Sequence, residues 1–283
     1  MISKIIFFSL FLLSLALSFG GEKVDGKRAT ITVVYDNQPY REDLVTSWGF
    51  SALIKVDGQN ILFDTGGEGK ILIKNMRKLN IPPKGIELVV LSHNHWDHTG
   101  GLLELIREGA RPKVILPKSF PDKFKEEMRR FVKIEEITGP REIAPGIWTT
   151  GEMGSTVIEQ SLIIKTDRGL IVITGCAHPG IASIVAKAKE LLGGPIYLVM
   201  GGFHLRGSSE KEILEIAKEF KKLGVINLAP SHCTGDTALS IFSREFGKHL
   251  LNSGVGAQFI VEDENGDKTE TDRNHPFTLQ KPG

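Results

Sequence analysis

The feature that constrains this chain most is a group of three histidines and one aspartate within six residues, directly after an apolar stretch at 87–92. The group is His93, His95, Asp97 and His98. Imidazole and carboxylate are the usual protein ligands of zinc and similar divalent ions. In an extended segment residues 93, 95 and 97 point to one side, and His98 turns the other way as the chain bends at the glycine pair that follows. The spacing therefore predicts a site for two adjacent metal ions.

Three further histidines repeat this context, because each follows the end of an apolar stretch. They are His178 after 170–174, His204 after 197–200 and His232 after 226–229. Ligands of α/β proteins gather at the carboxyl ends of strands, so we expect these side chains to converge on one rim with the first group. The alternative for any one of them is a hydrogen-bonded structural histidine. His249 and His275 lack this context and are predicted to be surface residues.

The two cysteines also lie beside histidines. Cys176 stands two residues before His178, and Cys233 directly follows His232. Two cysteines cannot build a disulfide framework, and their position favours metal or active-site chemistry. A single bridge between them is the alternative.

Composition excludes few functions. The 283 residues include 35 Lys and Arg against 34 Asp and Glu, a net charge of +1, and 41% are hydrophobic. This is the composition of a globular protein. A neutral chain shows no electrostatic footprint for nucleic acid, so we expect a small-molecule substrate. The sequence does not fix the oligomeric state.

The N-terminus has the pattern of an export signal. Lys4 is the only charge before Glu22, and an apolar stretch of about 14 residues lies at 5–18. A membrane-spanning helix needs roughly 20 apolar residues. We predict a cleaved signal peptide at 1–20, export to the periplasm or the extracellular space, and one domain over 21–283 without a stable membrane span. An uncleaved anchor or a buried N-terminal helix are the alternatives.

The remaining chain mixes hairpins with a later alternation of strands and helices, which is typical of stacked sheets with helices on the outer faces. An Asp57-Gly58 turn joins two early strands. Strands are expected at 29–35, 51–56, 60–64, 87–92, 113–116, 147–150, 160–166, 169–174, 195–200, 225–229 and 254–261. Helices are expected at 69–79, 101–108, 180–191, 209–222 and 235–247. Segment 117–146 is interpreted as an inserted helix with loops that forms a flap, with a plain surface helix as the alternative.

Three motifs resemble those of the metallo-β-lactamase superfamily. They are His93-x-His95-x-Asp97-His98, Phe63-Asp64-Thr65-Gly66 and Pro230-Ser231-His232. Three more are similar to the branch that contains the archaeal dihydropterin–ribofuranosyl-aminobenzene phosphate synthase. These are Gly175-Cys176-Ala177-His178-Pro179-Gly180, Gly201-Gly202-Phe203-His204-Leu205 and Ser231-His232-Cys233-Thr234-Gly235.

The resemblance implies a four-layer αββα sandwich, an α/β (α+β) fold, with one or two divalent ions at the sheet edge. Zinc is the first expectation, and Mn²⁺ and Fe²⁺ are the alternatives. The resemblance implies that His93 and His95 bind the first ion and that Asp97, His98 and His232 bind the second.

Two positions depart from the family pattern. Cys176 stands where the family has a bridging aspartate, and Glu152 stands where it usually has a histidine. Either Glu152 or His178 could complete the first metal shell. Asp64 is expected to brace the ligand loop through hydrogen bonds, or to be a turn residue only.

The expected function is that of a metal-dependent hydrolase, in which a metal-bound hydroxide attacks an ester, lactone, amide or phosphodiester. Asp97 would orient the hydroxide, and a histidine free of metal, His178 or His204, could act as an acid or hold an oxyanion. The alternative suggested by the branch is a transferase that couples a pterin diphosphate to an arylamine. A third class is a non-enzymatic metal-binding or redox protein that uses Cys176 and Cys233.

Overall fold

The computed structural model of the protein describes residues 29–261. The predicted signal peptide, His275 and the polar tail lie outside the described residues, so these predictions stay untested. No helix within 29–261 is long and apolar enough to cross a membrane.

The first sheet has seven strands in the order β13-β1-β2-β3-β4-β5-β6. Its strands are β1 (Ala29–Asp36), β2 (Phe50–Val56), β3 (Gln59–Phe63), β4 (Leu88–Val90), β5 (Lys113–Pro117), β6 (Lys133–Ile137) and β13 (Gln258–Val261). The Asp57-Gly58 turn joins β2 to β3, and both of its residues have positive φ angles. From β3 to β6 the strands run parallel. Their carboxyl ends therefore lie at one edge.

The second sheet has six strands in the order β12-β11-β10-β9-β8-β7. They are β7 (Arg141–Ala144), β8 (Ile147–Thr149), β9 (Leu162–Thr166), β10 (Gly169–Thr174), β11 (Ile196–Gly202) and β12 (Val225–Ser231). Strands β10, β11 and β12 run parallel, so the loops that follow them emerge side by side.

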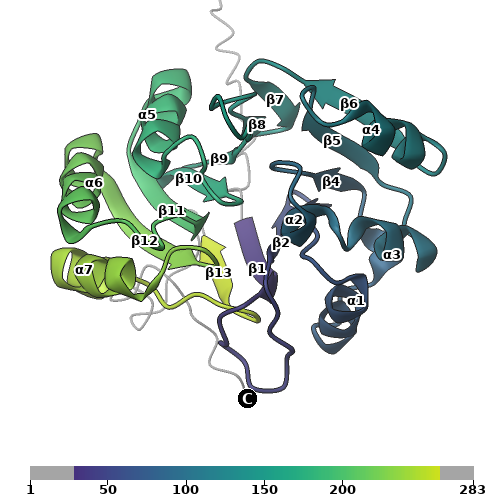
Figure 1. Ribbon diagram of the computed structural model, residues 1–283, viewed down its shortest axis with the longest axis horizontal. Helices are drawn as coiled ribbons and strands as arrows, with labels where there is room; N and C mark the ends of the chain where they lie inside the picture. Colours follow the sequence, from purple (N-terminus) through teal and green to yellow (C-terminus); the bar gives the residue numbers. More distant parts are fainter. Residues whose placement is uncertain (1–28, 262–283) are drawn as a thin grey trace, which may run out of the picture.

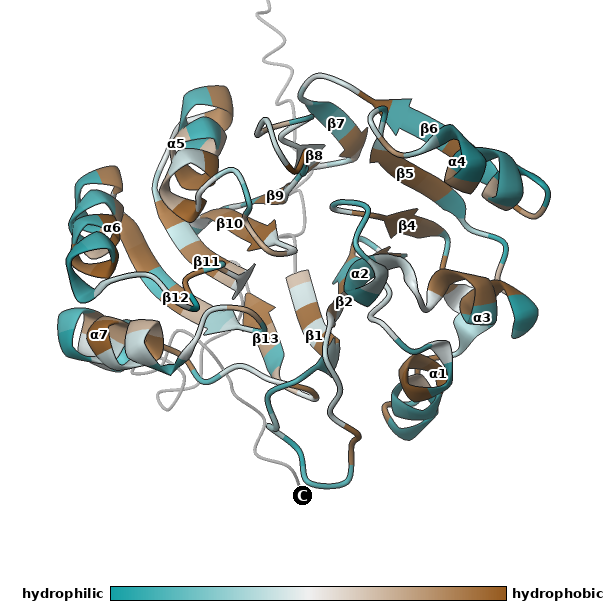
Figure 2. Cartoon of the chain, in the orientation of Figure 1, coloured by the Kyte–Doolittle hydropathy of each residue, from teal (hydrophilic) through white to brown (hydrophobic). Residues whose placement is uncertain are grey.

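Helices cover the outer face of each sheet (Figure 1). The first sheet carries α1 (Gly69–Lys78), α3 (Leu102–Arg107) and α4 (Asp122–Arg129), and the second carries α5 (Ile181–Leu192), α6 (Glu210–Leu223) and α7 (Asp236–Phe246). The strands are mostly hydrophobic, whereas the helices carry hydrophilic residues on the sides turned away from the sheets (Figure 2). This confirms the predicted αββα sandwich.

Side chains alternate between the two faces of a strand, and this alternation divides the hydrophobic core into three clusters. Ile61 and Phe63 of β3 point between the sheets, where they meet Ile171 and Met200 of the second sheet. Leu62, between them in sequence, points instead to the helices of the first sheet. A third cluster lies between the second sheet and its helices. Strands β4, β10 and β11 are thus buried on both faces, which holds the strand ends rigidly.

Segment 117–146 differs from its interpretation as an inserted helix with loops. It contains the expected helix α4, but it also contains β6 and β7, which are edge strands of the two sheets. Strand β6 was not predicted because its sequence carries many charges. These charges fit an edge strand, since one side of it is open to solvent. Part of the segment completes the sandwich, and residues 119–121 line a pocket beside His95.

The 93–98 motif also differs from a fully extended segment. The chain is extended through His95 and then enters a short helix, α2 (Trp96–Thr99), whose N-cap is His95. Asp97 and His98 therefore project from a helical turn, and both are buried.

Ser209→Ala is expected to destabilise the protein by about 1 kcal/mol, because Ser209 caps α6 in a capping box with Glu212. Urea unfolding would measure the change. Ser208→Ala is the control, since only the backbone N–H of Ser208 has a described bond, to Leu205. Equal stability of the two variants would contradict the capping role.

Candidate metal-binding site

The predicted ligands converge at the edge where parallel strands of both sheets end. His93 follows β4, Cys176 and His178 follow β10, His204 follows β11, and His232 follows β12. Their side chains form three groups of metal-ligand type that share the sulfur of Cys176. The structure thus brings together side chains from four strand ends, as the sequence predicted.

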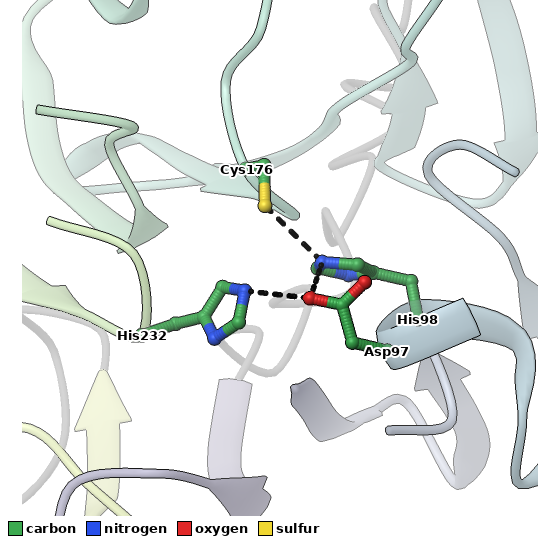
Figure 3. Close-up of side chains that lie close together, drawn as sticks. All are labelled: Asp97, His98, Cys176 and His232. Carbon is green, nitrogen blue, oxygen red and sulfur yellow. Dashed lines mark hydrogen bonds and ion pairs between the residues drawn. The ribbon is translucent and has the colours of Figure 1, made fainter. Parts of the chain in front are cut away.

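The first group consists of Asp97, His98, Cys176 and His232, whose ligand atoms lie within 4.8 Å of one another. They point toward a common centre (Figure 3). One oxygen of Asp97 lies 3.6 Å from Nε2 of His98 and 3.4 Å from Nε2 of His232. Nε2 of His98 lies 3.2 Å from the Cys176 sulfur.

The donors of this group suit a divalent ion, and one buried nitrogen among them lacks a hydrogen-bond partner. Nε2 of His232 is buried and has no hydrogen-bond partner. The other ring nitrogen, Nδ1, is 2.8 Å from the side-chain oxygen of Asn37. That contact fixes the ring and directs Nε2 into the cluster, as outer partners of metal-bound histidines do.

The second group consists of His93, Cys176 and His178. His95 lies beside it, with its Nδ1 3.0 Å from Nε2 of His93. The ring centroid of His178 is 4.6 Å from that of His93 and 4.9 Å from that of His95. Three imidazoles and one sulfur can therefore surround a second ion next to the first.

Asp64 braces the motif loop. Its carboxylate accepts hydrogen bonds from the Ser92 backbone N–H and hydroxyl, each at 2.7 Å, and lies 2.7 Å from Nδ1 of His98. Burial raises the pKa of Asp64 to about 7. The carboxylate aims Nε2 of His98 at the cluster. The expected outer-shell role thus agrees with the geometry better than a turn residue alone.

Glu159, which no sequence motif indicated, braces the opposite loop. Its buried carboxylate accepts N–H bonds from four consecutive residues, 175–178, at 2.9–3.2 Å. It also lies 2.9 Å from Nδ1 of His178. Burial alone would raise the pKa of Glu159, but the hydrogen bond from His178 and the other donors lower it to about 2. An ionised Glu159 accepts the Nδ1 proton, so Nε2 of His178 carries a free lone pair.

The electrostatics favour neutral imidazoles at His93 and His98 beside an ionised Asp97. Burial, together with the neighbouring His98, lowers the pKa of His93 to about 3. Burial and the neighbouring His232 likewise lower the pKa of His98 to about 3. Burial works to raise the pKa of Asp97, yet the nearby imidazoles of His232 and His98 lower it overall. Neutral imidazole and ionised carboxylate are the forms that bind metals.

Backbone strain is concentrated in the same loops. Of the six described non-glycine residues with positive φ, four lie at the site. They are Asp64, Ala177, His204 and His232, with φ between 51° and 62°. This conformation is costly for side chains other than glycine, and it persists where the surroundings enforce it. It directs the side chains that follow strand ends into the cluster.

The third group consists of Cys176, His204 and Cys233. Both sulfurs are buried, and His204 is exposed. A hydrogen bond between the two thiols raises the pKa of Cys176 and lowers the pKa of Cys233 to about 4. A hydrogen bond with Cys233 also raises the pKa of His204. Both cysteines are free rather than bridged.

The rim beside these groups carries aromatic and cationic side chains. The Trp48 ring lies 5.0 Å from the His232 ring, and the Arg206 guanidinium lies 5.2 Å above Trp48. Next to His95 is a pocket of about 240 Å³, lined in part by Ser119, Phe120 and Val157. The site is therefore open to a ligand of small-molecule size.

The structure changes the interpretation of two residues, Glu152 and His249. Glu152, an alternative ligand for the first metal, belongs to none of the three groups, and its carboxylate instead accepts the Ser119 backbone N–H at 2.7 Å. His178 stands in the cluster in its place. His249 is half-buried rather than on the surface, with Nδ1 3.0 Å from the Asn227 side chain.

Glu159→Gln is expected to weaken metal binding about 10–100-fold. The substitution replaces one carboxylate oxygen by an amide NH2 group, which donates hydrogen bonds and would face the N–H donors of residues 175–178. Each N–H left without an acceptor also costs about 1–3 kcal/mol of stability. Competition for zinc with a chromogenic chelator would measure the affinity. Glu152→Gln is the matched control and is expected to bind zinc as the wild type does. A Glu159→Gln variant that binds zinc with wild-type affinity would contradict the bracing role of Glu159.

Comparison with known proteins agrees with this geometry. A sequence profile described as "Metallo-beta-lactamase superfamily" matches residues 49–186. The chain is 34% identical over 265 residues to the 7,8-dihydropterin-6-methyl-4-(beta-D-ribofuranosyl)-aminobenzene-5'-phosphate synthase of Methanocaldococcus jannaschii, which covers 76% of this chain and 90% of that protein.

Solved structures give the same result. Tm1679, described as a metal-dependent hydrolase of the beta-lactamase superfamily, is 32% identical with a TM-score of 0.72, over 83% of this chain and 100% of that chain. YhfI from Bacillus subtilis, at 15% identity, shares the fold with a TM-score of 0.60 over 83% of this chain and 99% of that chain. The protein therefore belongs to the metallo-β-lactamase superfamily.

Proposed function

We propose that the protein is a metal-dependent hydrolase of small-molecule esters, lactones, amides or phosphodiesters. The observation that carries the proposal is the pair of adjacent donor groups that share the Cys176 sulfur where the parallel strands end. A structural zinc site is closed by four protein ligands, whereas a catalytic site keeps a position open. The exposed His95 and the adjoining pocket favour an open site.

The donor set divides between two ions. His93, His95 and His178 would hold the first, and Asp97, His98 and His232 the second, with Cys176 between them. Zinc suits this mixture of imidazole, carboxylate and thiolate, and Mn²⁺ or Fe²⁺ are alternatives. When bound, such ions acidify water and stabilise developing negative charge.

The chain's own residues would orient the reactants. The ionised Asp97 lies between His98 and His232 and can accept a hydrogen bond from the attacking water. His204 is exposed, and its ring centroid is 4.4 Å from that of His178. Its raised pKa favours an imidazolium that can donate to a substrate oxyanion or a leaving group.

The pocket beside His95 would hold the substrate. Apart from His95, its lining side chains are uncharged, and they combine the hydroxyls of Ser119 and Thr156 with apolar Phe120 and Val157. Such a surface favours an uncharged organic group. The proposed substrate therefore places its scissile bond at the donor groups and an uncharged group in this pocket.

A second candidate is transfer rather than hydrolysis. The similarity to the synthase from Methanocaldococcus jannaschii favours a site that couples a pterin diphosphate to an arylamine. The proposed export of the chain weighs against this candidate, because pterin assembly is normally cytosolic. Product analysis after incubation with a pterin diphosphate and an arylamine separates the two: a coupled product supports transfer, and hydrolysis without coupling supports the hydrolase.

His95→Ala is expected to lose bound metal and to lower hydrolysis of bis(p-nitrophenyl) phosphate about 100-fold or more, with little loss of stability because His95 is exposed. Metal analysis and a rate assay with zinc or manganese would measure both effects. His249→Ala is the control, since His249 bonds Asn227 outside the donor groups. Full metal occupancy in His95→Ala would count against the assignment. Absence of all turnover, including coupling, in the metal-loaded wild type would exclude both enzyme functions.

Val157→Trp is expected to raise KM about tenfold for substrates with a bulky acyl or aryl group, and to leave kcat nearly unchanged, because it fills a pocket that has only His95 of the donor residues in its lining. Steady-state kinetics with a short and a long ester would show the split. Phe131→Trp is the matched control, since Phe131 is exposed at the end of α4 and outside the pocket lining. Equal KM values for Val157→Trp and the wild type would place the substrate elsewhere.

A further inference from the structure

We propose that Cys176, His204 and Cys233 form a third metal-binding site, specific for thiophilic cations such as Zn²⁺, Cd²⁺ or Cu⁺. The two donor groups of the proposed hydrolase account for Cys176 but leave Cys233 without a role. The proposal does not depend on hydrolysis, because it concerns ion binding by this third group.

The ligand atoms are already gathered. One nitrogen of His204 and the sulfurs of Cys176 and Cys233 lie within 4.8 Å of one another. The Cys233 sulfur accepts the His204 backbone N–H at 3.3 Å and lies 3.7 Å from the Cys176 carbonyl oxygen. The three residues come from the loops after β10, β11 and β12, which are parallel neighbours in one sheet. The fold therefore fixes their positions before any ion binds.

Gly202 provides the room for the Cys233 sulfur. A Cβ atom at this position would lie 2.8 Å from that sulfur and 2.4 Å from the Gly175 carbonyl oxygen. A side chain at 202 would thus push Cys233 away from Cys176. The positive φ of His204, 53°, places that residue beside the sulfur at the cost of backbone strain.

The chemistry of this group differs from that of the other two. It has two sulfurs and one imidazole, whereas each of the other groups has one sulfur. It contains no carboxylate, so hard cations such as Mg²⁺ and Ca²⁺ have no oxygen ligand from it. Thiolates select zinc and cuprous ions. With two sulfurs instead of one, this donor set therefore predicts a stronger preference for soft cations than the first two groups have.

Access and burial also suit a bound ion. Both sulfurs are at most 5% exposed, and His204 lies at the surface. An ion can arrive from solvent at His204 and then lose its water to the buried sulfurs. Cys176 would be shared with the neighbouring ions as a bridging thiolate. Binding here uses the imidazole of His204, so it competes with the proposed contact of His204 with substrate.

Metal stoichiometry tests the proposal directly. The full chain, kept reduced with a phosphine, is saturated with Cd²⁺, freed of unbound metal and measured by mass spectrometry. The wild type is expected to hold three equivalents and Cys233→Ser two. A wild type that holds at most two equivalents, or a Cys233→Ser variant that still holds three, would overturn the proposal. A Cys176–Cys233 disulfide that persists under the reductant would also overturn it.

Cobalt substitution supplies a second readout. Titration of the wild type with Co²⁺ is expected to add a further thiolate-to-cobalt absorption increment with the third equivalent, and this increment should be missing in Cys233→Ser. His204→Ala keeps both thiols and changes an exposed side chain, so it guards against misfolding. It is expected to lose the third equivalent, whereas His249→Ala keeps it. A third equivalent retained in His204→Ala would contradict the site.

Failure of the third site can be told apart from failure of the proposed hydrolase. His95→Ala removes a residue outside the third group, so it should lower bound metal without removing the absorption increment that depends on Cys233. Loss of that increment in His95→Ala, with the fold intact by circular dichroism, would show that the third group does not bind independently and would overturn the proposal.

Discussion

The site depends on two buried carboxylates that turn strand ends into ligand loops. Asp64 follows β3 and binds the loop after β4, and Glu159 precedes β9 and binds the loop after β10. A buried carboxylate is costly unless hydrogen bonds compensate it. Here the compensating donors are the backbone and imidazole groups of the ligand loops. Each loop therefore takes the conformation that satisfies its carboxylate, and the metal-facing nitrogens of His98 and His178 are aimed as a result.

The close approach of the two sheets makes this arrangement possible. Gly175 lies where a Cβ atom would be 2.2 Å from the Ser92 hydroxyl and 2.9 Å from the Asp64 carboxylate. The loop after β10 in one sheet can thus touch the brace of the loop after β4 in the other. Cys176, the next residue, then reaches all three donor groups. The sulfur is shared because two loops from different sheets meet at this one glycine.

Much of the fold and part of the site could be predicted from the sequence, for physical reasons that differ between elements. Strands such as β10 and β11 are buried on both faces and so carry continuous apolar runs. The histidines are recognised because imidazoles after strand ends are rare. Glu159 was missed because its partners are mainly backbone amides, which have no signature in a sequence. Glu152 was weighed as an alternative to His178 from its place in the family pattern, and β6 was not predicted because an edge strand carries many charges.

The cysteine in place of the bridging aspartate changes what the cluster can bind. A carboxylate offers two hard oxygens, one to each ion, whereas a thiolate offers one soft sulfur to both. A Cys176 thiolate would therefore favour zinc over magnesium or calcium when ions bind at this site. The Cys233 sulfur lies within 4.8 Å of the Cys176 sulfur, so a second thiol stands beside the bridging position. The departure from the family pattern at residue 176 thus places two cysteines side by side, and only for this reason does the third donor group contain two sulfurs.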